Sequence, residues 1–178
     1  MPRLASGMIC LILASALAAP AWAQRNPRGT AKLDLNGKVV AVEYGRPSLR
    51  GRTVQQMLSR LGADGVWRLG ADQATTFSTS QDLRFGGAVI SKGEYSLWAK
   101  KQADGSWTLI FNKQHGQWGM NSDGLADRDP NLDVVAVQLM ESKAPSAVGQ
   151  VTITLEKAEN GAAISIVWGD MKLSANFE

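Results

Sequence analysis

Arginine and tryptophan side chains stand beside the predicted turns of this sequence, where they could form a binding site. Guanidinium groups bind carboxylates and phosphates through paired hydrogen bonds, and tryptophan rings stack on sugar rings or cations. If the turns meet at one end of the fold, they form a pocket for an anionic or polyhydroxylated ligand, with Arg46 and Arg68 as anion-binding groups. The candidate ligand-binding residues are Arg46, Trp67, Arg68, Asp72, Asn112, Lys113, Gln117 and Trp118.

The same residues have a purely structural alternative. Trp67 and Trp118 could fill the core, since aromatic side chains usually serve packing. Arg68 and Asp72 could then form a buried structural pair.

His115 is the single histidine of the chain and follows a predicted strand. Its imidazole could act as a general base near neutral pH if a carboxylate such as Asp72 oriented it. A hydrolase of envelope components that uses Asp72 or His115 is therefore an alternative to a binding module. The other alternative for His115 is a solvated loop residue, so the sequence leaves open whether the protein is an enzyme.

An acidic segment spaces oxygen atoms at every second residue, as calcium-binding loops do. Pro130 interrupts it, and the glycine and glutamate that such loops carry are replaced by Leu132 and Gln138. An acidic turn explains the pattern as well, so we expect neither a metal site nor a cofactor. The segment reads Asp127-x-Asp129-x-Asn131-x-Asp133.

The first 23 residues have the layout of a cleavable secretory signal: Arg3, an apolar run over 8–19, and Ala21-Trp22-Ala23. The run is shorter than the roughly 20 residues that span a bilayer. We expect cleavage after Ala23, a periplasmic or secreted location, and no transmembrane segment afterwards; a retained anchor is the alternative. Cys10 leaves with the signal, so no disulfide can form.

Charge and motif content exclude several classes of function. The 19 basic and 16 acidic residues give a net charge of +3, too balanced to predict nucleic-acid binding. Phosphate-binding, dinucleotide and nucleophile-elbow motifs are absent from the sequence. The expected partner is a small molecule or an envelope protein.

We expect residues 24–29 to form a flexible leader and residues 30–178 a single β domain.

Alternation of apolar and polar residues predicts about ten short strands. Asn36-Gly37 separates the first two as a hairpin turn, and Asn160-Gly161 and Gly169-Asp170 are predicted to join the last strands in the same way. The pattern favours a mainly β fold, a single antiparallel β-sandwich or jelly-roll-like domain. The remaining predicted strands cover 74–79, 83–85, 94–100, 107–111, 134–140, 151–155, 163–168 and 171–177.

One short helix is predicted near residues 53–61. Thr53 and Gln56 have the spacing of a capping box, and Gly62 could end the helix in the left-handed conformation. The apolar stripe consists of Val54, Met57, Leu58 and Leu61.

Six segments, in order from about Val39 to the C-terminus, resemble the family catalogued as domain of unknown function 2911 (DUF2911). The resemblance implies exported bacterial proteins with one such domain and no established activity. His115 and the acidic loop over 123–133 depart from the family pattern, which weakens the catalytic and calcium hypotheses. The segments are Tyr44-Gly45-Arg46-Pro47, Gly51-Arg52, residues 66–75, residues 93–97, residues 107–113 and Gln117-Trp118-Gly119.

Three functions therefore remain open from the sequence. The first is a periplasmic binding or interaction module, and the second is the envelope hydrolase. The third is a ligand-free structural protein that assembles with other envelope proteins through a sheet edge.

Overall fold

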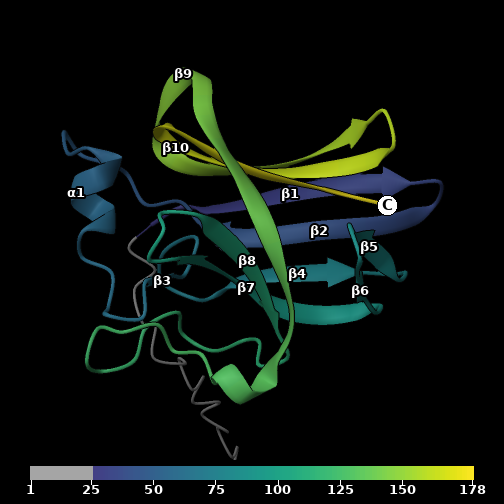
Figure 1. Ribbon diagram of the computed structural model, residues 1–178, viewed down its shortest axis with the longest axis horizontal. Coiled ribbons are helices and arrows are strands. Elements are labelled where there is room, and N and C mark those ends of the chain that lie inside the picture. The colour runs from purple at the N-terminus through teal and green to yellow at the C-terminus, as the bar shows by residue number, and fades with distance from the viewer. Residues whose placement is uncertain (1–25) are drawn as a thin grey trace, which may run out of the picture.

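The computed structural model describes residues 26–178, which form antiparallel strands and one short α-helix (Figure 1). The predicted signal peptide lies outside the described residues. The strands are β1 (Arg28–Leu35), β2 (Lys38–Gly45), β3 (Val66–Trp67), β4 (Thr75–Thr79), β5 (Leu83–Phe85), β6 (Ala88–Ile90), β7 (Gly93–Lys101), β8 (Trp107–Asn112), β9 (Asp133–Ala158) and β10 (Gly161–Phe177). The helix is α1 (Val54–Leu58), and a 3₁₀ turn, η1 (Pro130–Leu132), precedes β9.

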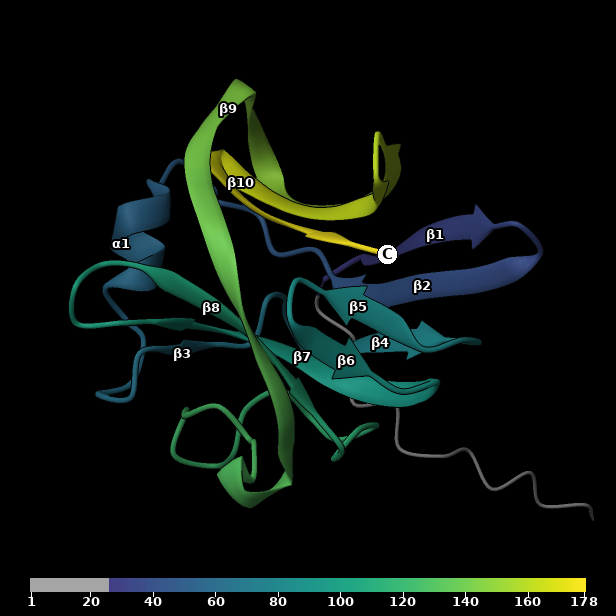
Figure 2. The ribbon, with the colours of Figure 1, turned by 45° about the vertical axis from the view of Figure 1, so that its right-hand side comes forward.

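The main sheet curls into a half-barrel with the strand order β1-β2-β4-β7-β8-β9-β10, and β3 pairs with β7 (Figure 2). A separate hairpin, β5–β6, lies at one end of the curl, and α1 lies at the other (Figure 1). Every strand pairing is antiparallel. The predicted mainly β, antiparallel fold with one short helix is confirmed.

The curl is held where β9 returns to the end of β2. The first part of β9 pairs with β8, and its later part pairs with β10. Within the later part, Leu49 donates its N–H to the Gly149 carbonyl (2.8 Å) and Val151 donates to the Pro47 carbonyl (3.1 Å). The buried Tyr44 hydroxyl donates to the Ile153 carbonyl (3.2 Å) and accepts from the Ile153 N–H (2.9 Å). These contacts satisfy backbone groups that would otherwise be orphaned.

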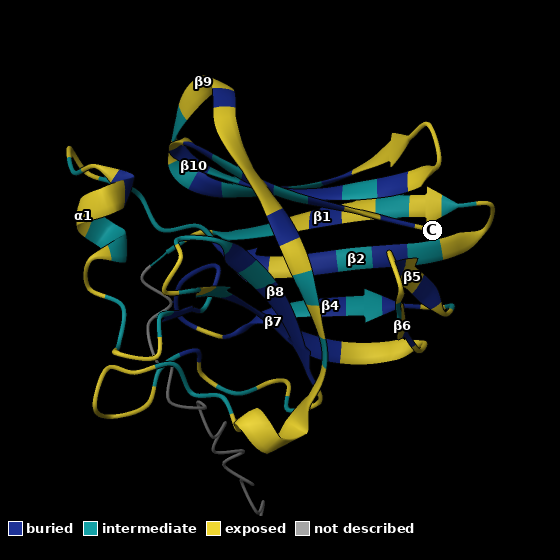
Figure 3. Cartoon of the chain, viewed as in Figure 1, coloured by how far each residue is buried: buried dark blue, intermediate teal, exposed yellow. Residues whose placement is uncertain are grey.

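Residues 95–99 of β7 are all buried (Figure 3), so both faces of this strand are covered. Leu97 belongs to the main core inside the curl, whereas Trp98 packs on the outer face with Val66 and Ile110. Ala126, from the loop that follows β8, packs against this outer cluster. Because a loop covers the outer face, the alternation predicted for residues 94–100 does not separate a buried face from a solvated one.

Two predicted strand breaks near the C-terminus were wrong. Residues 134–140 and 151–155 belong to one long strand, β9, and Gly169-Asp170 is a bulge inside β10 rather than a hairpin turn. Gly169 adopts φ +59, and the pairing register shifts on both sides of it. A side chain at this position would contact Val54 of α1, so the bulge lies where the helix packs on the strand.

The predicted capping box is present, but the predicted helix end was wrong. The Thr53 hydroxyl accepts from the Gln56 N–H (3.2 Å), and the Gln56 side chain accepts from the Thr53 N–H (2.9 Å). The helix ends at Leu58, followed by tight turns such as the bond from the Leu61 N–H to the Leu58 carbonyl. These turns satisfy the terminal groups, so Gly62 does not serve as a left-handed cap.

We expect Tyr44→Phe to lower the free energy of unfolding by about 1–3 kcal/mol, because it leaves the buried N–H and carbonyl of Ile153 without their partner. Urea denaturation followed by circular dichroism measures this loss. Tyr95→Phe is the matched control, since that hydroxyl only donates to the Ser91 carbonyl. Equal stabilities of the two variants would contradict the role given to Tyr44.

Candidate functional site

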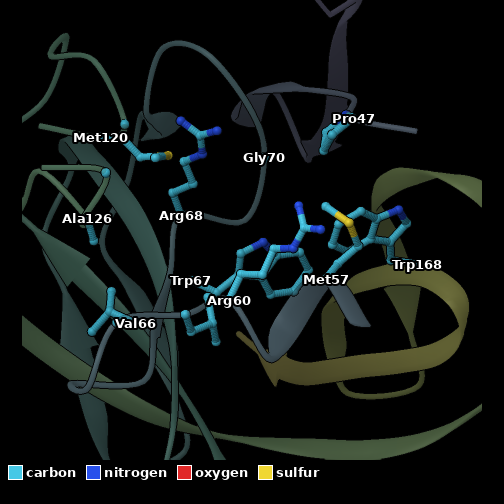
Figure 4. Close-up of a pocket in the computed structure, with 14 residues that line it drawn as sticks. Pro47, Met57, Arg60, Val66, Trp67, Arg68, Gly70, Met120, Ala126 and Trp168 are labelled. Atoms are coloured by element: carbon cyan, nitrogen blue, oxygen red, sulfur yellow. The ribbon is translucent and has the colours of Figure 1, made fainter. Parts of the chain in front are cut away.

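A cavity of ≈ 300 Å³ lies between α1, β3 and the loop over residues 113–129 (Figure 4). Its volume is at the lower end of the range of ligand pockets. Four glycines leave it room: Gly62, Gly70, Gly119 and Gly124. Apolar side chains form much of the wall, namely Pro47, Met57, Leu61, Val66, Met120 and Ala126.

Two buried tryptophans that stack on each other line this cavity. Trp67 stacks on Trp168 with ring centroids 5.6 Å apart and planes 10° apart. Trp107 meets Trp67 edge-on at 6.2 Å. The stack forms because β10 brings Trp168 against β3, which β7 holds by pairing Trp67 with Ala99. Within residues 26–178, the buried indole N–H of Trp168 has no hydrogen-bond partner.

Arginine side chains supply the charge of the cavity. Arg60 follows α1, and Arg68 follows β3; Figure 4 shows Arg68 beside Met120, on the side of the cavity opposite Trp168. Among the described residues that line the cavity, none is acidic. The cavity therefore combines an apolar wall with two cations.

Arg68 is a half-buried cation without a direct partner. Within the described chain its guanidinium takes part in no hydrogen bond or ion pair. Burial lowers the pKa of Arg68 below its usual range, and the charge of Asp72 opposes this effect. Asp72 instead accepts hydrogen bonds from the backbone N–H (3.0 Å) and the side chain of Asn26. The Arg68–Asp72 ion pair considered as a structural alternative does not form.

A strained turn sets the direction of Arg68. Leu69 and Asp72 have φ of +55° and +64°, a conformation that is rare for residues other than glycine and is an outlier for leucine. The Leu69 side chain is fully buried in the main core, which holds the turn in place. At Gly45 a side chain would collide with the Ala71 carbonyl, so glycine permits this close approach.

The loop over 113–129 is tied to the turn after Arg68. Gly119 donates its N–H to the Asp72 carbonyl (2.9 Å), and Ala74 donates to the Gln117 carbonyl (3.0 Å). The Gln117 side chain bonds within the loop, to the Gln114 and Asp127 carbonyls. These bonds bring Gly119 and the residues after it to the Arg68 side of the cavity.

Asn112 anchors both ends of this loop. Its fully buried side chain donates to the Asp129 carbonyl and the Asp133 carboxylate (2.7 Å each) and accepts from the Gln114 N–H (2.8 Å). Its contacts are therefore with the loop, and it does not line the cavity.

Arg46, Lys113 and Trp118 also lie outside the cavity. The Arg46 guanidinium donates to the Val151 carbonyl and the Thr152 hydroxyl (3.2 Å each), which fastens β9 to the end of β2. Lys113 is exposed, and Trp118 is 41% exposed. Of the eight candidate residues, the structure brings Trp67 and Arg68 together at the cavity.

His115 and the acidic segment are occupied elsewhere. The exposed imidazole of His115 faces Glu94 at 3.6 Å, rather than Asp72. In the acidic segment, Asp129 accepts from the Asn131 N–H, and Asp133 pairs with Arg128 and Asn112. Within residues 26–178, no group of three or more metal-ligating side chains is arranged to hold a metal ion.

Arg60 and Trp168 are cavity residues that the sequence reasoning missed. Arg60 is three residues after Met57, so in the predicted helix over 53–61 the two side chains would lie on the same face. That spacing could have identified Arg60 as a neighbour of the apolar stripe. Trp168 stands in a predicted strand, and nothing in its neighbourhood in the sequence indicates the stack with Trp67.

We expect Asn112→Ala to destabilise the protein by about 1–3 kcal/mol, because three part-buried hydrogen bonds to the fully buried Asn112 side chain are lost. Amide hydrogen exchange should also become faster over residues 113–129. Asn131→Ala is the matched control, since that exposed side chain bonds only to Asp129. A loop that stays protected in Asn112→Ala would contradict the anchoring role.

Arg68→Ala should change the free energy of unfolding by less than about 1 kcal/mol, because no ion pair is broken. Breaking a buried ion pair would cost about 3–5 kcal/mol instead. Urea denaturation at neutral pH separates the two cases, and a large loss would restore the structural pair.

Within the described residues, no helix has the length and apolarity needed to cross a bilayer. The family model described as "Protein of unknown function (DUF2911)" matches residues 26–177, from just before β1 to the end of β10. No curated protein and no solved structure matches the chain. The match covers more than half of the sequence, so this chain belongs to the DUF2911 family of proteins of unknown function.

Proposed function

We propose that the protein is an exported, periplasmic or secreted binding module that takes a small organic ligand into the cavity beside α1. The observation that carries the proposal is the half-buried guanidinium of Arg68 in a cavity walled by stacked tryptophans. A buried charge without a partner is costly, and a ligand group that pairs with it recovers part of that cost.

The shape of the cavity supports binding rather than catalysis. Ligand sites are concave and mostly apolar, with a few polar groups that orient the ligand. The hydrolase alternative has less support, because Asp72 is held by Asn26, His115 faces Glu94, and neither side chain lines the cavity.

A thermal-shift screen of the full protein tests the proposal, using aromatic acids, fatty acids, amino acids and sugars. A ligand at about ten times its Kd adds about 1.4 kcal/mol, which should raise Tm by roughly 3–6 °C for a chain of this size. Ala126→Phe places a ring in the cavity and should abolish this shift.

Val89→Phe is the matched control, since Val89 is 45% exposed on β6, at the far end of the molecule from α1. Its ligand-induced shift should equal that of the unmodified protein. If no ligand shifts Tm, or if Ala126→Phe keeps the full shift, the cavity is not a binding site. Crosslinking in intact cells would then test the ligand-free structural role.

A further inference from the structure

We infer that the ligand is an amphipathic anion, with a carboxylate, sulfonate or phosphate group held between Arg60 and Arg68 and an apolar body against Trp67 and Trp168. This inference rests on the proposed function, since it names the class of ligand for the same cavity. It narrows the choice between an anionic and a polyhydroxylated ligand.

The hydrogen-bonding inventory of the side chains argues for an anion. Arg60 and Arg68 are donors only, and so is the indole N–H of a tryptophan. Among the described lining residues there is no Asp, Glu, Asn, Gln, Ser, Thr or Tyr side chain. A sugar hydroxyl needs acceptors as well as donors, whereas an anionic oxygen accepts only. The side chains of this cavity therefore match an anion and leave hydroxyl protons without partners.

Local charge points in the same direction. Asp72 is the carboxylate whose charge acts on the pKa of Arg68, and it partly offsets the lowering caused by burial. It is hydrogen-bonded to Asn26 and makes no ion pair with Arg68. Arg60 is exposed just after α1 and carries no ion pair within residues 26–178. Both guanidinium groups remain available for an incoming anion, and paired contacts to it would be charge-assisted.

The rest of the wall determines the body of the ligand. Trp67 and Trp168 stack nearly parallel, and Met57 and Met120 border the cavity on opposite sides (Figure 4). Methionine adapts to irregular apolar shapes, so this wall suits a ring system or a short hydrocarbon chain of variable outline. A free inorganic anion would gain no apolar contact with this wall, so it should bind more weakly than an amphipathic one.

Two fluorescent probes separate charge from apolarity. 1-Anilinonaphthalene-8-sulfonate carries a sulfonate, and N-phenyl-1-naphthylamine has the same ring framework without it. We expect the anionic probe to bind the full protein about tenfold more tightly. Arg68→Gln and Arg60→Gln should each weaken the anionic probe by about five- to tenfold and leave the neutral probe unchanged.

Controls keep the result specific to the cavity. Arg84→Gln makes the same charge change on exposed β5, far from α1, and should leave both probes unaffected. Arg68→Lys retains the charge and should keep most of the preference if Arg68→Gln folds poorly. 1-Naphthoate should displace the anionic probe at about tenfold lower concentration than 1-naphthamide, whereas glucose and sodium sulfate should not displace it.

The outcomes distinguish a wrong ligand class from a cavity that binds no ligand. If the neutral probe binds as tightly as the anionic one and Ala126→Phe blocks it, the cavity is a binding site but the anionic class is wrong. If the arginine variants bind the anionic probe normally, Arg60 and Arg68 do not hold the anionic group. If neither probe binds and the ligand screen also fails, the proposed function itself is wrong.

Discussion

The hydrogen bonds that return β9 to the end of β2 are the constraint on which the cavity depends. Backbone groups of Pro47 and Leu49 bond with Gly149 and Val151, and the side chains of Tyr44 and Arg46 reach the same part of β9. This closure fixes the point from which the chain enters α1. It also holds β10 against β3, so that Trp168 stacks on Trp67.

The cavity arises where α1, β3 and the loop over 113–129 meet at one end of the curled sheet. The turn after Arg68 is held by the buried Leu69 side chain despite its strained backbone, and the loop over 113–129 is bonded to that turn. Strain of this kind persists only where the surroundings over-determine it. A rigid wall of this type pre-organises a binding site, because little further ordering is needed when a ligand enters.

Arg46 and Arg68 have different structural roles, although each of them lies beside a turn in the sequence. Arg46 lies beside a turn, as Arg68 does, but its guanidinium donates hydrogen bonds to a backbone carbonyl and a hydroxyl of β9. Arg68 meets no such acceptor within residues 26–178 and borders the cavity with Arg60. Asn112 and Gln117, which have ordinary hydrogen-bonding side chains for a ligand site, organise the loop instead.

The sequence by itself determined the features that depend on neighbouring residues: strands with alternating polarity, the Asn36-Gly37 turn, and the Thr53–Gln56 capping box, whose partners are three residues apart. Only the tertiary structure decided that two pairs of predicted strands are the continuous β9 and β10, and which polar groups face the cavity. The reason is that a hydrogen bond such as the one from Arg46 to Val151 joins residues far apart in the chain, and residue type alone specifies no such partner.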